Sequence, residues 1–201
     1  MGWYSERVVP RVVDATCGSG MLDDLRRRTC AGLRGEVLEL GFGSGTNLPF
    51  YPPAVTRVLA VEPSDVAWRL SEARRTASSV PVVRAGLDAA RLELPDVAVD
   101  AVVSTWTLCT IPDVAGALGE VRRVLRPGGP LRFAEHGMAP DVAVQRWQRR
   151  LAPWQYRLAG GCHLDRPITE LLTNAGFEVS LERFYAGLPR SFTAMFVGEA
   201  T

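Results

Sequence analysis

The sequence contains no lysine, so arginine supplies all 23 of its basic side chains. Without lysine, the chain can form neither a Schiff base with pyridoxal phosphate nor the phosphate-binding lysine contact of a P-loop. Histidine is scarce as well: His136 and His163 are the only two, which disfavours a multi-histidine metal site. Any chemistry that this protein performs must therefore use few reactive side chains.

Cysteine and long apolar runs are also limited. Four cysteines stand at positions 17, 30, 109 and 162, and no two of them form a C-x-x-C pair. This scatter predicts neither a zinc cluster nor a disulfide scaffold, so we expect no metal, reduced thiols and a cytoplasmic protein. No long apolar run follows the N-terminal residues, and we therefore expect neither a signal peptide nor a transmembrane segment.

The overall composition is that of one globular domain. The 201 residues are 47% apolar and 22% charged, with a formal net charge of +1. A chain of this length normally forms a single domain with a substantial core. A net charge this close to zero gives no electrostatic reason to expect nucleic acid as a partner. Nothing in this balance predicts an oligomeric state.

Apolar residues switch repeatedly between strand-like and helix-like spacing, which is typical of alternating strand–helix units on a parallel sheet. The expected strands lie at 36–40, 57–62, 80–84, 98–104, 130–135, 177–183 and 191–198. The last two are close enough in sequence to pair antiparallel. One expected helix is capped by Asp113 and ended by Pro127-Gly128-Gly129, and another runs from Ser64 to about Thr76.

The segment 141–158 has a different character. Tryptophan and leucine recur there at helical spacing, at positions 147, 151, 154 and 158, with arginines interleaved. The pattern favours an ordinary amphipathic helix that packs its apolar stripe on the domain. A helix that lies on a membrane surface or covers an apolar substrate is the alternative, and peripheral membrane contact is compatible with it. Pro153 is expected to interrupt the helix in either case.

Two glycine-rich segments compete as a ligand-binding loop. The segment 41–45 follows a buried strand, and the next strand ends on Glu62. A carboxylate some 20 residues beyond such a loop is placed to accept hydrogen bonds from the ribose hydroxyls of a nucleoside. The segment 14–20 has no such partner, so we interpret its last four residues, Cys17-Gly18-Ser19-Gly20, as an N-terminal turn.

The spacing of the glycines restricts the nucleoside ligand. A dinucleotide fold needs the pattern G-x-G-x-x-G. If the pattern starts at Gly41, its third glycine position is occupied by Thr46, and if it starts at Gly43, that position is occupied by Leu48. The segment E-x-G-x-G-x-G also has no basic residue nearby in the sequence to meet phosphates. This favours a ligand without phosphate in its centre, such as S-adenosylmethionine, over NAD.

Motifs on both sides of this loop carry a family resemblance. Glu39 to Gly45, Glu62-Pro63, Leu92 to Asp100 and Leu125 to Gly129 resemble, in order and spacing, the class I S-adenosylmethionine-dependent methyltransferases of the quinone-biosynthesis type. A narrower resemblance, to the subgroup that includes alkyl-thiol S-methyltransferases, rests on Gly45 to Pro52, Thr107-Leu108-Cys109, Glu135-His136 and Gly161-Cys162 with Leu164 and Arg166. Animal members of that subgroup carry an N-terminal membrane anchor, which this sequence is expected to lack.

The resemblance implies a fold and a division of the chain. It implies a single-domain, Rossmann-like α/β fold with a mostly parallel seven-stranded sheet, one antiparallel strand near the C-terminus, and helices on both faces. Within residues 1–201, the segments would be an N-terminal helical cap (1–34), a cofactor-binding core (35–135), a substrate-side helical segment (136–176) and a C-terminal strand pair (177–201).

The resemblance also implies a cofactor site. The residues assigned to it are Glu39, Gly41, Phe42, Gly43, Gly45, Asn47, Glu62, Pro63, Asp88, Ala89, Thr105 and Trp106. The glycines would wrap the methionine part of the cofactor, and Glu62 would hold its ribose. Asp88 and Ala89 would face the adenine, and Thr105 and Trp106 would border the methyl group. Glu39 would contact the cofactor or position the loop, whereas Asp100 is expected only to fix the start of its strand.

Catalysis by such an enzyme is mostly positioning, because the sulfonium is already a strong electrophile. A thiol, with an ordinary pKa of about 8.5, needs little help to ionise, whereas an alcohol or phenol needs a base. The candidates for that base are His136, His163 and Asp165. Cys109 is expected to be part of a buried wall.

Several acceptors remain open at this point. The sequence lacks the Asn/Asp-Pro-Pro-Tyr and Pro-Cys motifs that would indicate methylation of nucleic acid. It also lacks an aspartate cluster after the fourth strand that would indicate a catechol-type magnesium site. We expect a small, largely apolar acceptor, with a thiol or sulfide first. The alternatives are O- or C-methylation of a phenolic or quinone-like metabolite, N-methylation of a lipid amine, and a protein that binds the cofactor without turnover.

Overall fold

A computed structural model of the chain describes residues 7–17 and 20–201. Seven strands form one sheet in the order β3-β2-β1-β4-β5-β7-β6. The strands are β1 (Gly35–Leu40), β2 (Val55–Val61), β3 (Val82–Gly86), β4 (Ala101–Thr105), β5 (Leu131–His136), β6 (Val179–Tyr185) and β7 (Ala194–Ala200). Only β7 runs antiparallel to its neighbours, β5 and β6. The expected α/β fold with one antiparallel strand near the C-terminus is confirmed.

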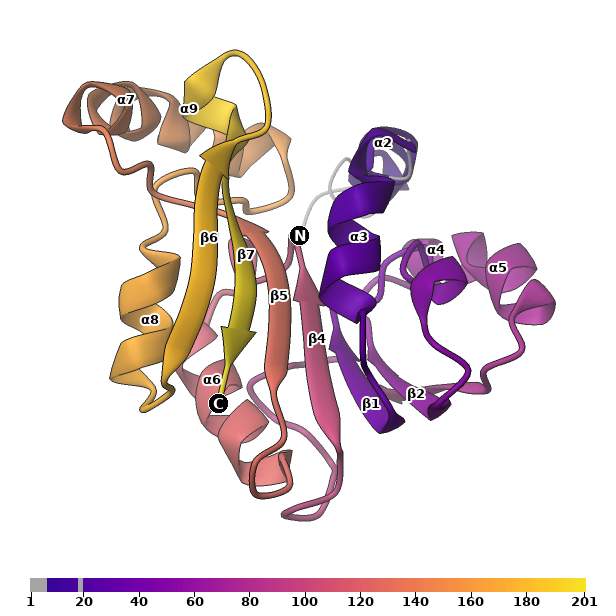
Figure 1. Cartoon of the computed structure of the whole chain (residues 1–201). Helices are drawn as coiled ribbons and strands as arrows, with labels where there is room; N and C mark the ends of the chain where they lie inside the picture. The colour runs from indigo at the N-terminus through magenta and orange to yellow at the C-terminus, as the bar shows by residue number, and fades with distance from the viewer. Residues whose placement is uncertain (1–6, 18–19) are drawn as a thin grey trace.

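Helices cover both faces of this sheet (Figure 1). The described helices are α2 (Val9–Cys17), α3 (Asp23–Cys30), α4 (Asp65–Leu70), α5 (Glu72–Ala77), α6 (Val114–Val124), α7 (Val142–Leu158), α8 (Ile168–Asn174) and α9 (Arg190–Thr193), with short 3-10 turns at Gly20–Leu22 and Leu48–Phe50. As expected, Asp113 caps α6, because its carboxylate accepts a hydrogen bond from the Gly116 N–H at 2.9 Å.

The central strand β1 has apolar side chains on both faces, as a strand covered on both sides requires. Leu38 and Leu40 pack in a core with residues of α6 and α8, including Leu118. Val37 packs on the other face with Cys30 of α3. These two layers hold the end of β1 rigidly, and the segment after Leu40 is therefore placed by the core.

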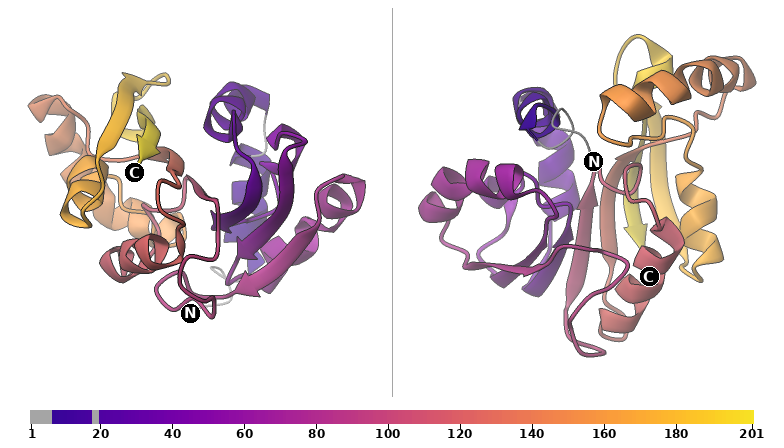
Figure 2. Two further views of the ribbon diagram at one scale, coloured as in Figure 1. Left: turned by 60° about the horizontal axis from the view of Figure 1, so that its bottom comes forward. Right: turned by 180° about the vertical axis from the view of Figure 1, so that it is seen from behind.

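The parallel strands all end at one edge of the sheet, where ligands bind in open α/β folds. Beyond this edge, α2 lies on the side of β1, and α7 with α9 lies on the side of β6 and β7 (Figure 1). The view from behind in Figure 2 agrees with this arrangement. Within the described residues, no helix combines the length and apolarity that crossing a bilayer requires.

Several local expectations were wrong. The helix expected from Ser64 to Thr76 breaks at Ser71 into α4 and α5, where the Ser71 hydroxyl donates to the Trp68 carbonyl at 2.7 Å. The turn expected at 17–20 falls largely outside the described residues: α2 ends at Cys17, residues 18–19 are not described, and a 3-10 turn begins at Gly20. Helix α7 continues through Pro153 rather than stopping there.

The apolar stripe of α7 is also on the wrong side for the favoured interpretation. Trp147, Trp154 and Leu158 are 58%, 64% and 61% exposed and Leu151 is half-buried, so most of the stripe faces solvent rather than the domain. The buried residue of α7 is Gln148, whose amide donates to the carbonyl oxygens of Gly137 and Leu164 at 2.9 and 3.0 Å. The hydrogen bonds of Gln148 therefore hold α7 on the domain, and its two tryptophan side chains remain largely exposed.

Candidate active site

The glycine loop follows the end of β1. Gly41, Gly43 and Gly45 have φ angles of 63°, 59° and 78°, in the left-handed region that favours glycine. At Gly41 the space is also closed, because a Cβ there would lie 2.2 Å from Thr107 Oγ1. The loop therefore approaches the segment after β4 more closely than any side chain would allow.

Glu62, directly after β2, is buried and bound to this loop. Its Oε2 accepts a hydrogen bond from the Gly43 N–H, and its Oε1 accepts one from the Ser64 N–H, both at 2.7 Å. Burial raises the pKa of Glu62 above its ordinary value, although these two backbone donors and Arg84 act in the opposite direction. The acid expected to meet a ribose is thus placed at the loop by backbone hydrogen bonds.

Glu39 lies inside β1 and is hydrogen-bonded to two residues that follow the loop. Its two carboxylate oxygens accept hydrogen bonds from Asn47 Nδ2 at 2.8 Å and from the Tyr51 hydroxyl at 2.7 Å. Asn47 Nδ2 also donates to Thr105 Oγ1 at 3.0 Å. Complete burial raises the pKa of Glu39 to about 7, against the lowering effect of these hydrogen bonds. The contacts that the structure gives Glu39 position the loop.

Arg26 of α3 completes this buried network, although no motif in the sequence indicated it. Its Nη1 donates to Asn47 Oδ1 at 2.7 Å, and its guanidinium lies 4.9 Å from the centre of the Trp106 ring. A second arginine, Arg74, donates to the Ser44 carbonyl at 3.0 Å. The expectation that no basic residue lies near the glycine loop was therefore wrong, because α3 and α5 bring arginines there from distant parts of the sequence.

A pocket opens between the glycine loop and the end of β4. Its lining residues are Val13, Arg26, Gly41, Phe42, Gly43, Ser44, Thr46, Thr105, Trp106 and Thr107. Trp106 has a φ of 51°, which is strained for a residue with a side chain. Its N–H is held by the Ala134 carbonyl of β5 at 2.9 Å. The fold thus holds Trp106 in a strained conformation at the wall of this pocket.

Two further residues of the expected cofactor site are Phe42, within the glycine loop, and Pro63, after β2. Phe42 is buried and packs on Trp68, with the ring centres 5.5 Å apart. Pro63 is exposed and follows Glu62 directly. Phe42 therefore reaches the pocket wall from the core side, whereas Pro63 lies at the surface.

Asp88 and Ala89 lie in the loop after β3. Asp88 is exposed, and its Oδ1 accepts a hydrogen bond from the Ala90 N–H at 2.9 Å, as in a turn. Ala89 is buried. The structure does not bring either residue into the pocket lined by the glycine loop.

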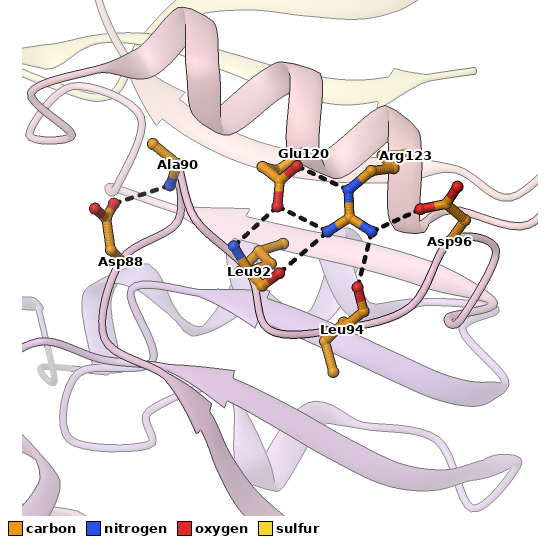
Figure 3. A network of polar contacts seen from close by, with 7 residues as sticks. All are labelled: Asp88, Ala90, Leu92, Leu94, Asp96, Glu120 and Arg123. Atoms are coloured by element: carbon orange, nitrogen blue, oxygen red, sulfur yellow. Dashed lines mark hydrogen bonds and ion pairs between the residues drawn. The ribbon is translucent and has the colours of Figure 1, made fainter.

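The rest of this loop is fixed by two side chains of α6 (Figure 3). Glu120 accepts a hydrogen bond from the Leu92 N–H at 2.9 Å, and Arg123 donates to the Leu94 carbonyl and to Asp96 at 2.8 Å each. The hydrogen bond from Arg123 lowers the pKa of Glu120 to about 2. This bridge holds a stretch without helix or strand against α6.

The two histidines lie in different surroundings. His136, at the end of β5, places its Nε2 2.8 Å from Cys162 Sγ. His163 is half-buried, and its ring centre lies 5.0 Å from that of Tyr156. Burial lowers the pKa of His163, which favours its neutral form. Asp165 is half-buried two residues further on.

Cys109 and Cys162 meet beside His136, a grouping that no local motif indicated. Their sulfur atoms lie 3.7 Å apart, and both residues are buried, as expected for Cys109. The hydrogen bond between the two thiols lowers the pKa of Cys162 to about 5, whereas the same hydrogen bond and burial raise the pKa of Cys109. Burial lowers the pKa of His136, but Cys162 and Glu135 outweigh it and raise the pKa above its ordinary value.

Comparison with known proteins identifies the family. The family model for a methyltransferase domain matches residues 38–133, the segment that holds the glycine loop and Glu62. Thiol S-methyltransferase TMT1B of Homo sapiens is 35% identical over 170 residues, which cover 81% of this chain and 68% of that enzyme. The chain belongs to the S-adenosylmethionine-dependent methyltransferases.

Other members of this family are similar over most of the chain. Phosphatidylethanolamine N-methyltransferase of Cereibacter sphaeroides is 30% identical, with 77% of each chain covered. The structure of an S-adenosylmethionine-dependent methyltransferase from Thermotoga maritima covers all of both chains with a TM-score of 0.67 at 20% identity, which shows the shared fold. The chain spans 62–68% of the length of the curated thiol S-methyltransferases that it matches.

Proposed function

We propose that this methyltransferase acts on a small, largely apolar acceptor, with a thiol or sulfide as the favoured class. The observation that carries the acceptor class is the 35% identity to human thiol S-methyltransferase TMT1B over most of this chain. The scarcity of reactive side chains supports it, because a thiol ionises with little help from the protein.

The residues around the glycine loop fit S-adenosylmethionine. Each oxygen of Glu62 accepts one backbone hydrogen bond and keeps capacity for another, which suits the two ribose hydroxyls. Gly41 and Gly43 let the backbone come close to the methionine part. Arg26 presents a buried cation at the same pocket, which suits the cofactor's carboxylate. Arg26 thus joins the cofactor set as a residue outside the family motifs.

The remaining assignments follow the same division. Thr105 and Trp106 border the reacting methyl group, because both line the pocket opposite the glycines. Asp88 and Ala89 face the adenine from the loop after β3. Glu39 and Asn47 act through the loop, because Asn47 Nδ2 donates hydrogen bonds both to Glu39 Oε1 and to Thr105 Oγ1.

The cofactor, when bound, supplies a methyl group activated by its sulfonium. The task of the chain is then to hold an acceptor atom close to that methyl group and to exclude water. For a phenol or another weak acid, His163 is the better base of the two histidines, since its lowered pKa keeps it neutral and able to accept a proton. A thiol acceptor needs neither histidine for this purpose.

A second candidate function is N-methylation of a lipid amine. The 30% identity to the phosphatidylethanolamine N-methyltransferase of Cereibacter sphaeroides, over 77% of each chain, favours it. The exposed aromatic face of α7 would then lie where a lipid surface meets the protein. O- or C-methylation of a phenolic or quinone-like metabolite is the remaining alternative, and a demethylmenaquinone methyltransferase of Thermobifida fusca is 34% identical over a shorter stretch, 60% of this chain and 53% of that enzyme.

Turnover of isotopically labelled cofactor with single acceptors separates these functions. We expect labelled product from an alkyl or aryl thiol, and little or none from a phenol or from phosphatidylethanolamine in vesicles. The Glu62→Gln variant, run in parallel, reports background transfer. Product from phenols or the lipid amine alone would overturn the thiol assignment.

A further inference from the structure

Three side chains from three separate segments converge beside the pocket. Cys109 comes from the loop after β4, His136 from the end of β5, and Cys162 from the loop after α7. Their Sγ and imidazole nitrogen atoms all lie within 4.8 Å of one another. We propose that Cys109, His136 and Cys162 bind a zinc ion through two thiolates and one imidazole.

The geometry is close to that of such a site. With Zn–S bonds of about 2.3 Å and Zn–N bonds of about 2.0–2.1 Å, tetrahedral ligand atoms lie roughly 3.5–3.8 Å apart. The two sulfur atoms lie 3.7 Å apart, and His136 Nε2 lies 2.8 Å from Cys162 Sγ. Seating the ion therefore requires the His136 imidazole to move back from Cys162 Sγ by roughly 0.7–1 Å and to settle at a similar spacing from Cys109 Sγ, from which its ligand nitrogen now lies within 4.8 Å, while the sulfur pair is already at its coordination distance.

The donor set selects the metal. Two cysteine sulfurs and an imidazole nitrogen suit zinc, whereas magnesium and calcium prefer oxygen ligands. Two thiolates balance the charge of a divalent ion, so the buried complex carries no net charge. A cysteine–histidine pair acting alone would need only two of these groups, whereas here a second cysteine sulfur lies 3.7 Å from the first.

Neighbouring contacts hold the three segments in place. Arg166 donates to the carbonyl oxygens of Leu108 and Ile111, both at 2.7 Å, and so fixes the turn that carries Cys109. The backbone N–H of His163 donates to the Cys109 carbonyl at 3.0 Å. These contacts join the loop of Cys162 to the loop of Cys109.

Gln148 links the other two segments. Its Nε2 donates to the carbonyl of Gly137, next to His136, and to the carbonyl of Leu164, two residues after Cys162. This completely buried amide thus ties the end of β5 to the loop after α7. Ligand positions fixed by surrounding hydrogen bonds are what a metal centre requires.

Three protein ligands leave a tetrahedral ion one open position. Cys109 Sγ lies 3.7 Å from the carbonyl oxygen of Trp106, and Trp106 lines the cofactor pocket. If the proposed function holds, this fourth position takes the sulfur of the acceptor thiol. The sulfur gives a lone pair to the ion, and its proton leaves to solvent. A neutral thioether binds the ion less strongly than a thiolate, so the methylated product is released.

The metal content of the purified chain tests the site without any assay of activity. We expect one zinc ion per chain by mass spectrometry, lost in Cys109→Ser and in Cys162→Ser. Cys30→Ala is the matched control, because Cys30 is a buried cysteine outside the cluster, and it should keep the zinc. Exchange of wild type with cobalt should give the intense visible absorption of a tetrahedral thiolate site, a readout that does not depend on how the variants fold.

The outcomes separate this inference from the proposed function. Metal below roughly a tenth of an ion per chain, after equilibration with zinc or cobalt, overturns the site, as does a stable Cys109–Cys162 disulfide in freshly purified protein. Addition of an alkyl thiol without methyl donor should shift the cobalt spectrum, and the matching alcohol should not; no shift overturns the open position. Thiol methylation by metal-free protein refutes the role of the open zinc position and leaves the proposed function standing, whereas a metal-loaded protein that methylates no thiol refutes the proposed function alone.

Discussion

The backbone N–H of Gly43 donates a hydrogen bond to Glu62 Oε2 at 2.7 Å, so the acid at the end of β2 fixes the loop at the end of β1. The second carboxylate oxygen is held by Ser64 at the same distance. Both contacts use backbone donors, so they orient the carboxylate regardless of neighbouring side chains. Its free lone pairs can then meet the cofactor without rearrangement of the loop.

Glu62→Gln should weaken binding of S-adenosylhomocysteine by roughly 10- to 150-fold, since a hydrogen bond to a charged group contributes about 1.5–3 kcal/mol. The glutamine also turns an amide N–H toward a backbone donor. Titration calorimetry measures the change. Glu93→Gln, an exposed acid in the loop after β3, is the matched control and should bind as wild type does. Unchanged affinity in Glu62→Gln would remove Glu62 from the site.

Arg26→Gln should discriminate between two ligands. If Arg26 binds the amino-acid carboxylate of the cofactor, its loss weakens S-adenosylhomocysteine by about 10-fold or more. Methylthioadenosine lacks that carboxylate, so its affinity should change little. Arg27→Gln, the exposed neighbour on α3, serves as the control. Equal losses for both ligands would show that Arg26 only supports the loop through Asn47.

Glu39 should make stability depend on pH. Its pKa is 4.5 ordinarily and about 7 in the folded chain, so between these values the folded state holds a proton that the unfolded chain has lost. Stability therefore falls as pH rises from about 5 to 7, by about 3 kcal/mol at most. Urea unfolding at pH 5 and pH 8 measures this, and Glu39→Gln should reduce the slope. The same slope in wild type and variant would contradict the assignment to Glu39.

The exposed face of α7 should bind anionic lipid. Trp147 and Trp154 are more than half exposed, and the arginines at positions 146, 149, 150 and 157 are exposed beside them. We expect sedimentation with phosphatidylglycerol vesicles, reduced by salt and by the double substitution Trp147→Ser with Trp154→Ser. Phosphatidylcholine vesicles are the control. Wild type that stays in solution with both lipids would show that α7 makes no membrane contact.

Much of the fold followed from the spacing of apolar residues. The alternation of strands and helices predicted the sheet because β1 and its neighbours are buried on both faces. The orientation of α7 could not be predicted, since Gln148 docks it through carbonyl groups of Gly137 and Leu164 that are distant in sequence. At the break between α4 and α5 the Ser71 hydroxyl bonds the Trp68 carbonyl, a local contact that the spacing of apolar residues does not indicate.

The site was predictable where its residues follow one another along the chain. The glycine loop and Glu62 lie at adjacent strand ends, as the spacing indicated. Arg26 has no motif around it, and only the packing of α3 against β4 and β5 brings it to Asn47. Cys109, His136 and Cys162 likewise meet only through the fold. Groups that converge from distant segments leave no local pattern.

A competition among acceptors tests the central claim most directly. A thiol, a phenol and an amine on the same carbon skeleton, at equal concentrations, are incubated with the protein and S-adenosylmethionine carrying a deuterated methyl group. The ratio of labelled products by mass spectrometry gives the relative kcat/KM values. We predict that the labelled methyl thioether predominates by at least about 100-fold, equivalent to about 2.7 kcal/mol of transition-state discrimination. Predominance of the labelled ether or amine would contradict the account.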